Sequence, residues 1–336
     1  MPVTSLTDFF SIHQDIDQQA SYAVALSGGP DSMALAHLLI EWAQAHQKKL
    51  YLLTVDHGLR PEAKAEAQMI AHWTASLEKN FIHHEILTWA GEKPPTGIME
   101  AARSARYHLM ATYCHDHKIN TLFIAHHQDD QAETFLIRLS KGSGLDGLAA
   151  MGTTRQYNDE LILARPLLNV SKQEIIDYCT VQNLPTINDP SNQNSDYLRP
   201  RLRASMQVLE QEGLSAKRLA MTAKRMARAR RALEEITQRT YAECLIENDT
   251  QKTILNFDRL HQEPEEIGLR VLQMVLESAR IDADYQVRME KLEELFAAIW
   301  HQSSDFKPRT LGGYVFSLKS DKTSKNTSLW IEKEKG

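Results

Sequence analysis

A short glycine-containing segment, Ser27-Gly28-Gly29-Pro30-Asp31-Ser32, stands between an apolar run and a helical pattern. Two glycines let a backbone turn tightly and approach a ligand closely. The amide groups that follow them, at the positive end of a helix, form a cradle for an anion. Asp31 would repel phosphate there unless a divalent cation bridged the two. The segment therefore predicts a phosphate-binding loop beside a metal ion; the alternative is a plain strand–turn–helix junction in which Asp31 stabilises the helix dipole.

A second cluster is the run His126-His127-Gln128-Asp129-Asp130, with Glu133 one helical turn further on. A helix places these acids on one face, where carboxylates repel unless a cation or proton offsets them. Mg²⁺ suits a few carboxylates together with phosphate oxygens, and the absence of nearby cysteine argues against zinc. The two histidines are candidates for proton transfer or for holding a carboxylate. The alternative is a group of acids at a helix start, which the dipole favours.

Two further motifs carry polar groups. Asp56 and His57 end another apolar run, and Gly58 lets the chain turn sharply after them, unless this is only an Asp–Gly turn;. Arg103 and Arg106 share one stripe of a helical pattern, and a guanidinium suits phosphate oxygens. The ordinary alternative for that stripe is surface ion pairing.

Alternating elements must position these motifs. Between residues 20 and 190, apolar runs alternate with stretches of helical apolar spacing. The expected strands are 22–26, 50–55, 81–87, 121–125 and 161–164. The expected helices are 30–44, 61–77, 98–117, 128–140 and 171–182. This alternation predicts an α/β fold with a doubly wound parallel sheet, in which ligands bind beyond the carboxyl ends of the strands. A glycine-rich loop at 141–148 is expected near the same edge and is a candidate to close over a substrate.

The pattern changes after residue 188. Residues 215–246 contain neither Gly nor Pro and predict one long helix;. Further helices are expected at 264–280 and 284–301, and a short β-hairpin within 310–332. We therefore expect two domains: residues 1–209 with the phosphate loop, and residues 210–336, mainly helical and ending in the hairpin.

Charge is distributed unevenly along the chain. There are 38 Lys plus Arg against 44 Asp plus Glu, a net charge of −6. Residues 191–231 nevertheless hold ten basic and three acidic residues, or +7, which leaves −13 for the rest. The asymmetry predicts a local site for a polyanion on an acidic body. No acid lies between Lys217 and Arg231, although a solvated helix face remains the alternative there.

Composition excludes several classes of protein. With 42% hydrophobic and 24% charged residues, the chain is not collagen-like, coiled-coil or wholly disordered;. No apolar run approaches the ~20 residues of a membrane span, and no secretory signal is expected at the start. Cys114, Cys179 and Cys244 show no CxxC spacing, so we expect buried thiols and a cytoplasmic protein. The oligomeric state stays open, a homodimer included.

Five motifs in series resemble those of the tRNA(Ile)-lysidine synthetases, a family of PP-loop ATP pyrophosphatases. The motifs are SGGPDSMAL at 27–35, VDHGLR at 55–60, EAARSARY at 100–107, AHHQDDQAET at 125–134, and DPSN at 189–192 followed by Arg199, Arg201 and Arg203. The resemblance is dense over residues 20–205. It departs from the family pattern at Asn194, where a second Asp is expected.

The resemblance implies a reaction in two steps. ATP adenylates the C2 carbonyl oxygen of the cytidine at the first anticodon position of a minor isoleucine tRNA. The ε-amine of free L-lysine then attacks C2 and expels AMP, which forms lysidine and changes the specificity of the tRNA from methionine to isoleucine. The implied cofactors and partners are ATP, Mg²⁺, tRNA and L-lysine, with no membrane.

The resemblance also implies residue roles. Residues 27–32 would bind the phosphates of ATP, and Asp56 and His57 would face its adenosine. The implied Mg²⁺ ligands are Asp31, Asp129 and Asp130. The implied catalytic residues are Asp31, Asp130, Glu133 and Arg106, of which Glu133 would receive the lysine ammonium or its proton. The implied tRNA contacts are Arg199, Arg201, Arg203, Lys224, Arg225 and Arg228.

Three rival functions share parts of this pattern. A PP-loop tRNA thiolation enzyme would be expected to carry paired cysteines or an iron–sulfur cluster, which the cysteine spacing does not offer. An amidating PP-loop ligase would be expected to carry a glutaminase domain and has no need of the +7 window. A nucleotide-regulated RNA-binding module would not need so many acids beside ATP. Release of pyrophosphate that depends on both tRNA and lysine separates these functions.

Overall fold

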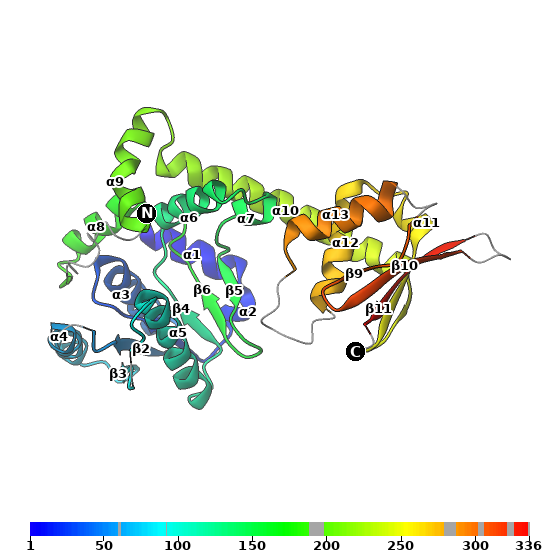
Figure 1. Ribbon diagram of the computed structural model, residues 1–336. Helices are drawn as coiled ribbons and strands as arrows, with labels where there is room; N and C mark the ends of the chain where they lie inside the picture. Colours follow the sequence, from blue (N-terminus) through cyan, green and yellow to red (C-terminus); the bar gives the residue numbers. More distant parts are fainter. Residues whose placement is uncertain are drawn as a thin grey trace. The chain divides into compact units, whose positions relative to one another are not determined.

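The computed structural model describes residues 1–59, 62–91, 93–187, 198–278, 287–301, 306–320 and 326–334. The chain divides into two compact units, Met1–Ala227 and Arg228–Gly336 (Figure 1). The division falls inside one long helix, α10 (Ala216–Cys244), whereas the sequence analysis placed the change of domain near residue 210.

A six-stranded sheet forms the centre of the N-terminal unit. Its strand order is β3-β2-β1-β4-β6-β5. All neighbours are parallel except β5, which runs antiparallel to β6. The strands are β1 (Ser21–Ala25), β2 (Lys49–Asp56), β3 (Ile82–Thr88), β4 (Thr121–Phe123), β5 (Thr154–Gln156) and β6 (Ile162–Ala164). The predicted doubly wound sheet is confirmed, and its order reverses between β1 and β4, the place where such folds bind ligands.

Helices cover both faces of this sheet. On one side the core contains residues of α1 (Pro2–Ile12), α3 (Pro30–Ala45) and α8 (Lys172–Val181), and on the other residues of α5 (Ile98–Asp116). Val24 belongs to the first core and its neighbour Ala23 to the second, as the period-two alternation of a strand requires;. The remaining helices that begin in this unit are α2 (Gln14–Asp17), α4 (Glu62–Ser76), α6 (Gln128–Ser140), α7 (Leu145–Leu148), α9 (Leu198–Gln211) and α10.

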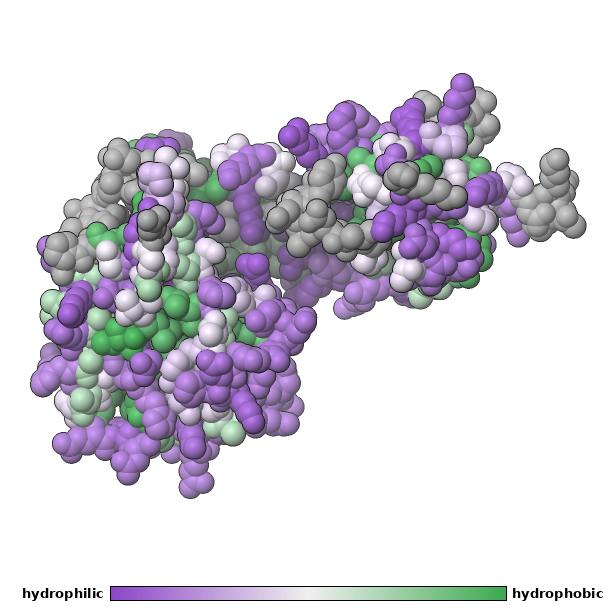
Figure 2. All heavy atoms as spheres, turned by 60° about the horizontal axis from the view of Figure 1, so that its bottom comes forward, coloured by the Kyte–Doolittle hydropathy of each residue, from purple (hydrophilic) through white to green (hydrophobic). Residues whose placement is uncertain are grey.

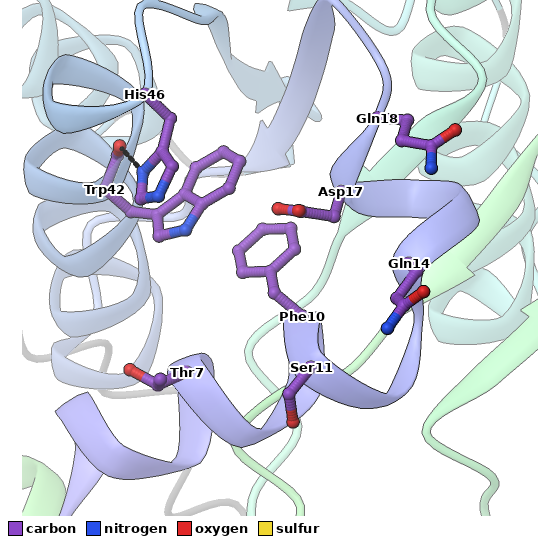
Figure 3. Close-up of a pocket in the computed structure, with 8 residues that line it drawn as sticks. All are labelled: Thr7, Phe10, Ser11, Gln14, Asp17, Gln18, Trp42 and His46. Atoms are coloured by element: carbon purple, nitrogen blue, oxygen red, sulfur yellow. Dashed lines mark hydrogen bonds between the residues drawn. The ribbon is translucent and has the colours of Figure 1, made fainter.

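The N-terminal helix α1, which the sequence analysis did not single out, packs at the edge of the sheet where α3 ends. Phe10 of α1 stacks on Trp42 of α3 with ring centroids 3.9 Å apart. Together with His46 these rings line part of an open cavity of about 450 Å³ (Figure 3). Because α3 starts at the carboxyl end of β1 and finishes here, the cavity lies at the opposite edge from the predicted phosphate loop.

The C-terminal unit contains more strand than the sequence predicted. The expected hairpin is present as β10 (Tyr314–Ser320) and β11 (Thr327–Lys333), with Phe316 opposite Ile331. It belongs to a five-stranded antiparallel sheet of order β7-β8-β11-β10-β9. The other elements are β7 (Leu245–Asn248), β8 (Lys252–Asn256), α11 (Phe257–Leu260), α12 (Glu265–Ser278), α13 (Met289–His301) and β9 (Arg309–Leu311). One core joins α12 and α13 to this sheet through residues such as Leu272 and Phe296.

Cys114, Cys179 and Cys244 are all buried and form no disulfide, as predicted. Hydrophilic side chains dominate the face of the molecule that Figure 2 shows. None of the described helices combines the length and the apolar character needed to cross a membrane.

Candidate active site

The turn after β1 requires glycine. Gly28 has a φ of +83°, which a residue with a Cβ rarely adopts;. A Cβ at this position would lie 2.6 Å from Cδ1 of Ile187 and 2.9 Å from Cδ1 of Ile70. The Ile187 N–H group donates a hydrogen bond to the Gly28 carbonyl at 2.9 Å. The loop is therefore held tightly on one side by its neighbours.

On its other side the loop leads into the start of α3. Gly29 is the N-cap and provides no side-chain hydrogen bond, and Pro30 is the first helical residue. The Ser32 hydroxyl accepts from the Ser27 N–H at 3.1 Å and donates to the Gly29 carbonyl at 3.0 Å. The hydroxyls thus brace the turn, and the backbone amides of the first helical turn are the natural donors for an anion.

Asp31, in the first turn of α3, is paired with a lysine that the sequence analysis did not single out. The Lys172 ammonium lies 2.6 Å from Oδ1 and 2.8 Å from Oδ2 of Asp31. The backbone N–H of Lys172 donates to Asp129 Oδ1 at 3.0 Å. Lys172 opens α8, where Ser171 and Glu174 form a capping box. A well-capped helix start therefore presents one residue, Lys172, to two of the predicted metal ligands.

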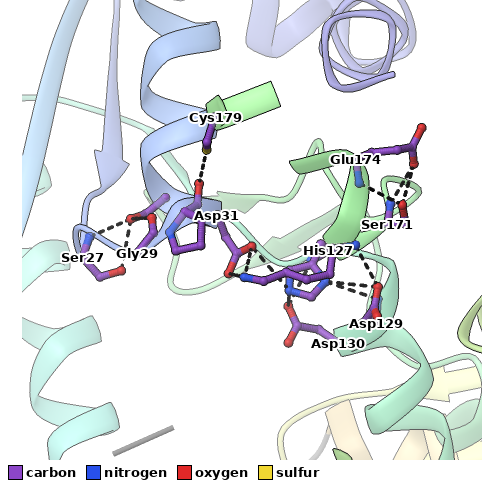
Figure 4. A network of polar contacts seen from close by, with 12 residues as sticks. Ser27, Gly29, Asp31, His127, Asp129, Asp130, Ser171, Glu174 and Cys179 are labelled. Atoms are coloured by element: carbon purple, nitrogen blue, oxygen red, sulfur yellow. Dashed lines mark hydrogen bonds and ion pairs between the residues drawn. The ribbon is translucent and has the colours of Figure 1, made fainter. Parts of the chain in front are cut away.

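His127, the N-cap of α6, lies among three acids (Figure 4). The backbone N–H of His127 donates to Asp130 Oδ2 at 3.0 Å, and the ring Nδ1 of His127 accepts from the backbone N–H of Asp129 at 3.3 Å. Its Nε2 lies 3.5 Å from Asp130 Oδ2 and 3.7 Å from Asp31 Oδ1. Asp129 and Asp130 of one motif and Asp31 of another are thus gathered around one buried imidazole.

The electrostatics of this group favour a proton on His127. Burial lowers the pKa of His127, but the hydrogen-bonding contact with the Asp129 carboxylate and the charges of Asp130 and Asp31 outweigh burial and raise the pKa above its ordinary value. The same contact lowers the pKa of Asp129. A readily protonated imidazole therefore offsets part of the repulsion between the carboxylates.

Glu133, one turn further along α6, is almost fully buried, with 3% of its surface exposed. Its carboxylate accepts a hydrogen bond from Arg203 Nε, and Arg203 Nη2 lies 3.6 Å from Asp130 Oδ1. Burial raises the pKa of Glu133, although Arg203 acts in the opposite direction. Arg203, a tRNA contact expected from the sequence, has its guanidinium on these two acids, in a position suited to a cation.

His126 lies in a positively charged environment formed by arginines, whereas its neighbour His127 lies among acids. Burial, and then the charges of Arg165, Arg103, Arg199 and Arg106, lower the pKa of His126 to about 3. Arg165 Nε donates to His126 Nδ1 at 3.2 Å. In the described ranges, none of these four arginines forms an ion pair with a carboxylate. Guanidinium groups without carboxylate partners are suited to a phosphate-bearing ligand.

Asp56 and His57 lie at the end of β2. The Asp56 carboxylate accepts from the Gly58 N–H at 2.9 Å, which is the Asp–Gly turn that the sequence allowed. The Nδ1 atom of His57 is buried and has no hydrogen-bond partner among the described residues. Burial and the charge of Arg106 lower the pKa of His57. A buried ring nitrogen without a partner is a candidate contact for a ligand.

Sequence reasoning missed Lys172 and Arg165, although signals for both were present. Arg165 directly follows the expected strand 161–164, at the same edge of the sheet as Asp56, and Lys172 lies at the start of the expected helix 171–182. The motif residues Arg60, Asp189, Pro190, Ser191, Asn192 and Asn194 lie outside the described residues.

The remaining predicted contacts lie on helices. Arg199 and Arg201 are on α9, and Lys224, Arg225 and Arg228 are exposed on α10. The loop 141–148 is fastened to α6 in this structure, because Arg138 Nη1 donates to the Gly147 carbonyl at 2.7 Å.

The carboxylates fit Mg²⁺ in part. No group of three or more His, Cys, Asp or Glu side chains within the described parts of the chain is placed to hold a metal by itself. Asp31 and Asp130 nevertheless converge on the same imidazole nitrogen. Mg²⁺ commonly binds through one or two carboxylates together with phosphate oxygens and water. The all-oxygen donor set therefore suits Mg²⁺ that arrives with a nucleotide.

A family model and several related sequences assign the chain to the same family. Residues 3–210 match the PP-loop domain. The chain is 44% identical over 235 residues to the tRNA(Ile)-lysidine synthase of Rhodopseudomonas palustris, covering 69% of this chain and 67% of the relative. It is 36% identical over 305 residues to that of a Methylobacterium species, covering 90% of this chain and 87% of the relative. This chain belongs to the tRNA(Ile)-lysidine synthase family.

Two further comparisons concern length and fold. The tRNA(Ile)-lysidine synthase of Wolbachia pipientis is 36% identical over 286 residues, and the matched region spans 65% of that relative. The chain thus spans about two thirds of the length of several synthases that it matches. Among solved structures, the U34-tRNA thiolase NcsA from Methanococcus maripaludis has a TM-score of 0.58 at 16% identity and covers 68% of this chain and 78% of its own. That likeness concerns the fold.

Proposed function

We propose that this chain uses ATP to attach lysine to C2 of the first anticodon cytidine of a minor isoleucine tRNA, in the cytoplasm, forming lysidine. The observation that carries the proposal is that a cluster of acidic side chains and a cluster of arginines lie close together at the switch point of a PP-loop sheet. Asp31, Asp130 and Glu133 form an acidic group, and the arginines around His126 form a basic one. Membership of the tRNA(Ile)-lysidine synthase family supplies the substrate class.

The chemistry requires an activated oxygen. In the first step the C2 carbonyl oxygen of cytidine attacks the α-phosphorus of ATP, and pyrophosphate leaves. In the second step the ε-amine of lysine attacks C2, the C2–O bond breaks, AMP leaves, and the amine loses a proton. A carbonyl oxygen is a poor leaving group until it is adenylated, so catalysis consists mainly of positioning and charge stabilisation.

The loop Ser27–Ser32 binds the phosphates of ATP through its backbone amides. Asp56, at the end of β2, and His57, directly after it, face the adenosine. Arg106 stabilises negative charge on the reacting phosphates. Asp31 and Asp130, with Asp129 behind them, would hold Mg²⁺, which would neutralise phosphate charge.

Glu133 receives the lysine ammonium or accepts its proton. Burial raises the pKa of its carboxyl group, a direction that favours proton uptake;. Arg203 occupies this carboxylate in the present structure, so the incoming ammonium has to share or displace that contact. The neighbouring Arg199 and Arg201, and the exposed Lys224, Arg225 and Arg228 of α10, contact the phosphates of the tRNA, whose target base is splayed from its loop.

The decisive experiment incubates the purified chain with tRNA, lysine and labelled ATP. Pyrophosphate release is expected to require tRNA, and mass analysis of the anticodon nucleoside is expected to show the mass of lysidine only when lysine is present. Product without tRNA, or a sulfur-containing nucleoside, would contradict the proposal.

Asp31→Asn is expected to reduce product formation by about 10²-fold or more, because removal of one preorganised charge in a phosphate-transfer site costs rates of this order. Asp116→Asn, an exposed change in the last turn of α5, is the matched control and is expected to retain activity. Full turnover by Asp31→Asn would remove Asp31 from the proposed mechanism.

A further inference from the structure

Arg165 is a buried cation without a buried anion. Only 5% of its surface is exposed, and it follows β6 at the carboxyl edge of the sheet. Its Nη1 donates to the Gly152 carbonyl at 3.0 Å and its Nε donates to His126 Nδ1 at 3.2 Å. No carboxylate in the described ranges forms an ion pair with it. Burial of a charge without a paired anion is costly, so we expect the contact between Arg165 and His126 to have a function.

The contact fixes the proton on His126. A guanidinium has five donors and no acceptor, so the His126 nitrogen that faces it must be an unprotonated acceptor. The Nδ1 atom therefore carries no proton, and the ring is a neutral imidazole with its hydrogen on Nε2. An imidazolium in the same place would turn an N–H group toward the guanidinium, and burial and the surrounding arginines disfavour that cation as well.

The other ring nitrogen points to a ligand. His126 Nε2 has no hydrogen-bond partner among the described residues. The atom is also not fully buried, so a ligand can reach it. Arg103, Arg106 and Arg199 lie close enough to influence the ring electrostatically, and none has a carboxylate partner in the described ranges. An N–H donor among guanidinium groups that lack anions is suited to an anionic oxygen acceptor.

We propose that Arg165 is a positioning residue, which holds His126 as a neutral Nε2–H donor to a phosphate oxygen of the nucleotide. A neutral imidazole kept from protonation by its surroundings polarises an oxygen without itself giving up a proton, as in other enzymes that suppress the charge of a histidine. His126 is thus a hydrogen-bond donor and neither a general base nor a metal ligand. This inference rests on the proposed function only in requiring that the chain bind ATP.

The first test observes the ring nitrogens directly in the full chain labelled with ¹⁵N-histidine. Correlation of ring nitrogens with ring protons distinguishes a protonated from an unprotonated nitrogen, and His126→Gln assigns the signal. In the wild type we expect an unprotonated Nδ1 and a protonated Nε2 from about pH 5 to pH 8, a range in which an ordinary histidine titrates. In Arg165→Met we expect His126 to titrate nearer to its ordinary pKa. An unchanged spectrum in Arg165→Met would overturn the proposal.

The second test identifies the acceptor. A non-hydrolysable ATP analogue added without tRNA is expected to shift the Nε2 proton of His126. tRNA added without a nucleotide is expected to leave that proton in place. A shift with tRNA alone would overturn the assignment to the nucleotide, because tRNA also carries phosphate oxygens. These measurements need neither lysine nor turnover, so they succeed or fail independently of lysidine formation.

The third test separates positioning from general stability. Arg165→Met is expected to lower kcat by about 10-fold or more with a smaller change in the KM for ATP, and Arg165→Lys is expected to recover part of the loss because ammonium still donates. In a His126→Gln background, whose amide retains a donor independent of the ring tautomer, Arg165→Met is expected to cost little more. Equal losses in both backgrounds would show that Arg165 does not act through His126.

Discussion

Adjacent histidines at the start of α6 have opposite charge preferences. His127 lies among Asp31, Asp129 and Asp130, and its pKa is raised despite burial. His126 lies among arginines, and burial with their charge lowers its pKa to about 3. The backbone turn at the N-cap of α6 therefore directs two consecutive imidazoles into regions of opposite potential, one suited to cations and one to phosphate.

This contrast predicts a pH dependence of stability. In the unfolded chain His126 takes up a proton near pH 6.5, whereas in the folded chain it does so only near pH 3;. Between these values the unfolded state binds more protons, so the free energy of unfolding falls as pH decreases below about 6.5, with a slope of up to about 1.4 kcal/mol per pH unit from this residue.

Urea titrations of wild type and His126→Gln from about pH 7.5 to pH 5 measure this contribution. The difference in unfolding free energy between the two proteins is expected to shift in favour of His126→Gln as the solution becomes acidic. A difference that stays constant with pH would show that His126 protonates equally in both states.

At this scale the sequence located the acids better than their partners. Asp31, Asp129, Asp130 and Glu133 could be grouped because spacing within a helix and position after a strand are local properties. The contacts of Lys172 with Asp31, and of Arg203 with Glu133, join residues 141 and 70 positions apart in the chain. Such pairs depend on how α8 and α9 pack, which no local pattern records.

At the scale of elements, the loop between β1 and α3 is the most constrained feature. Gly28→Ala is expected to lower the free energy of unfolding by about 2–4 kcal/mol, because it combines a positive φ with contacts to Ile187 and Ile70 that are too short;. Urea titration of the purified variant gives the value.

Gly29→Ala is the matched control in the same loop. Gly29 has a φ of −69° and its nearest neighbour to an added Cβ is Ser27 Oγ at 3.8 Å. We expect a loss below about 1 kcal/mol there. Equal losses at the two positions would mean that strain at Gly28 is relieved by movement of Ile187.

The α/β alternation predicted the five parallel strands, the helices on both faces and the edge that carries the site, because apolar runs alternate along the chain with stretches of helical spacing. The antiparallel edge strand β5 was not predicted. The C-terminal strands β7 and β8 were not predicted. β7 follows α10 without a break that Gly or Pro would mark, and its exposed residues show no apolar run like those of the N-terminal strands. The hairpin was predictable because Gly312 and Gly313 precede two longer strands.

On the scale of the whole molecule, many of the basic residues of the positively charged segment 191–231 lie on α10. Lys217, Lys224, Arg228 and Arg231 recur at helical spacing on one face, and all are exposed. No acid of the described residues forms an ion pair with these four side chains. This face is the strongest candidate for a phosphate-binding surface outside the nucleotide site.

Charge reversal at Lys224 and Arg228 together is expected to weaken tRNA binding by about 10-fold or more and to flatten its dependence on salt, because fewer counterions are released. ATP binding is expected to stay unchanged. Filter binding at several salt concentrations measures both the affinity for tRNA and its dependence on salt. Charge reversal at the exposed Lys64 and Lys118 is the control for net charge. If tRNA affinity falls equally in both double variants, the effect belongs to overall charge and not to α10.

The first part of α10 also has a role beneath α6. Leu219 and Ala223 belong to a small core with Ala132 and Phe135, on the helix that carries Asp130 and Glu133. A truncated fragment that stopped at residue 209 would lack this support and would expose apolar side chains under the acids. Anyone who wishes to express the nucleotide-binding portion alone should therefore place the terminus beyond Ala223, even though the motifs themselves finish earlier.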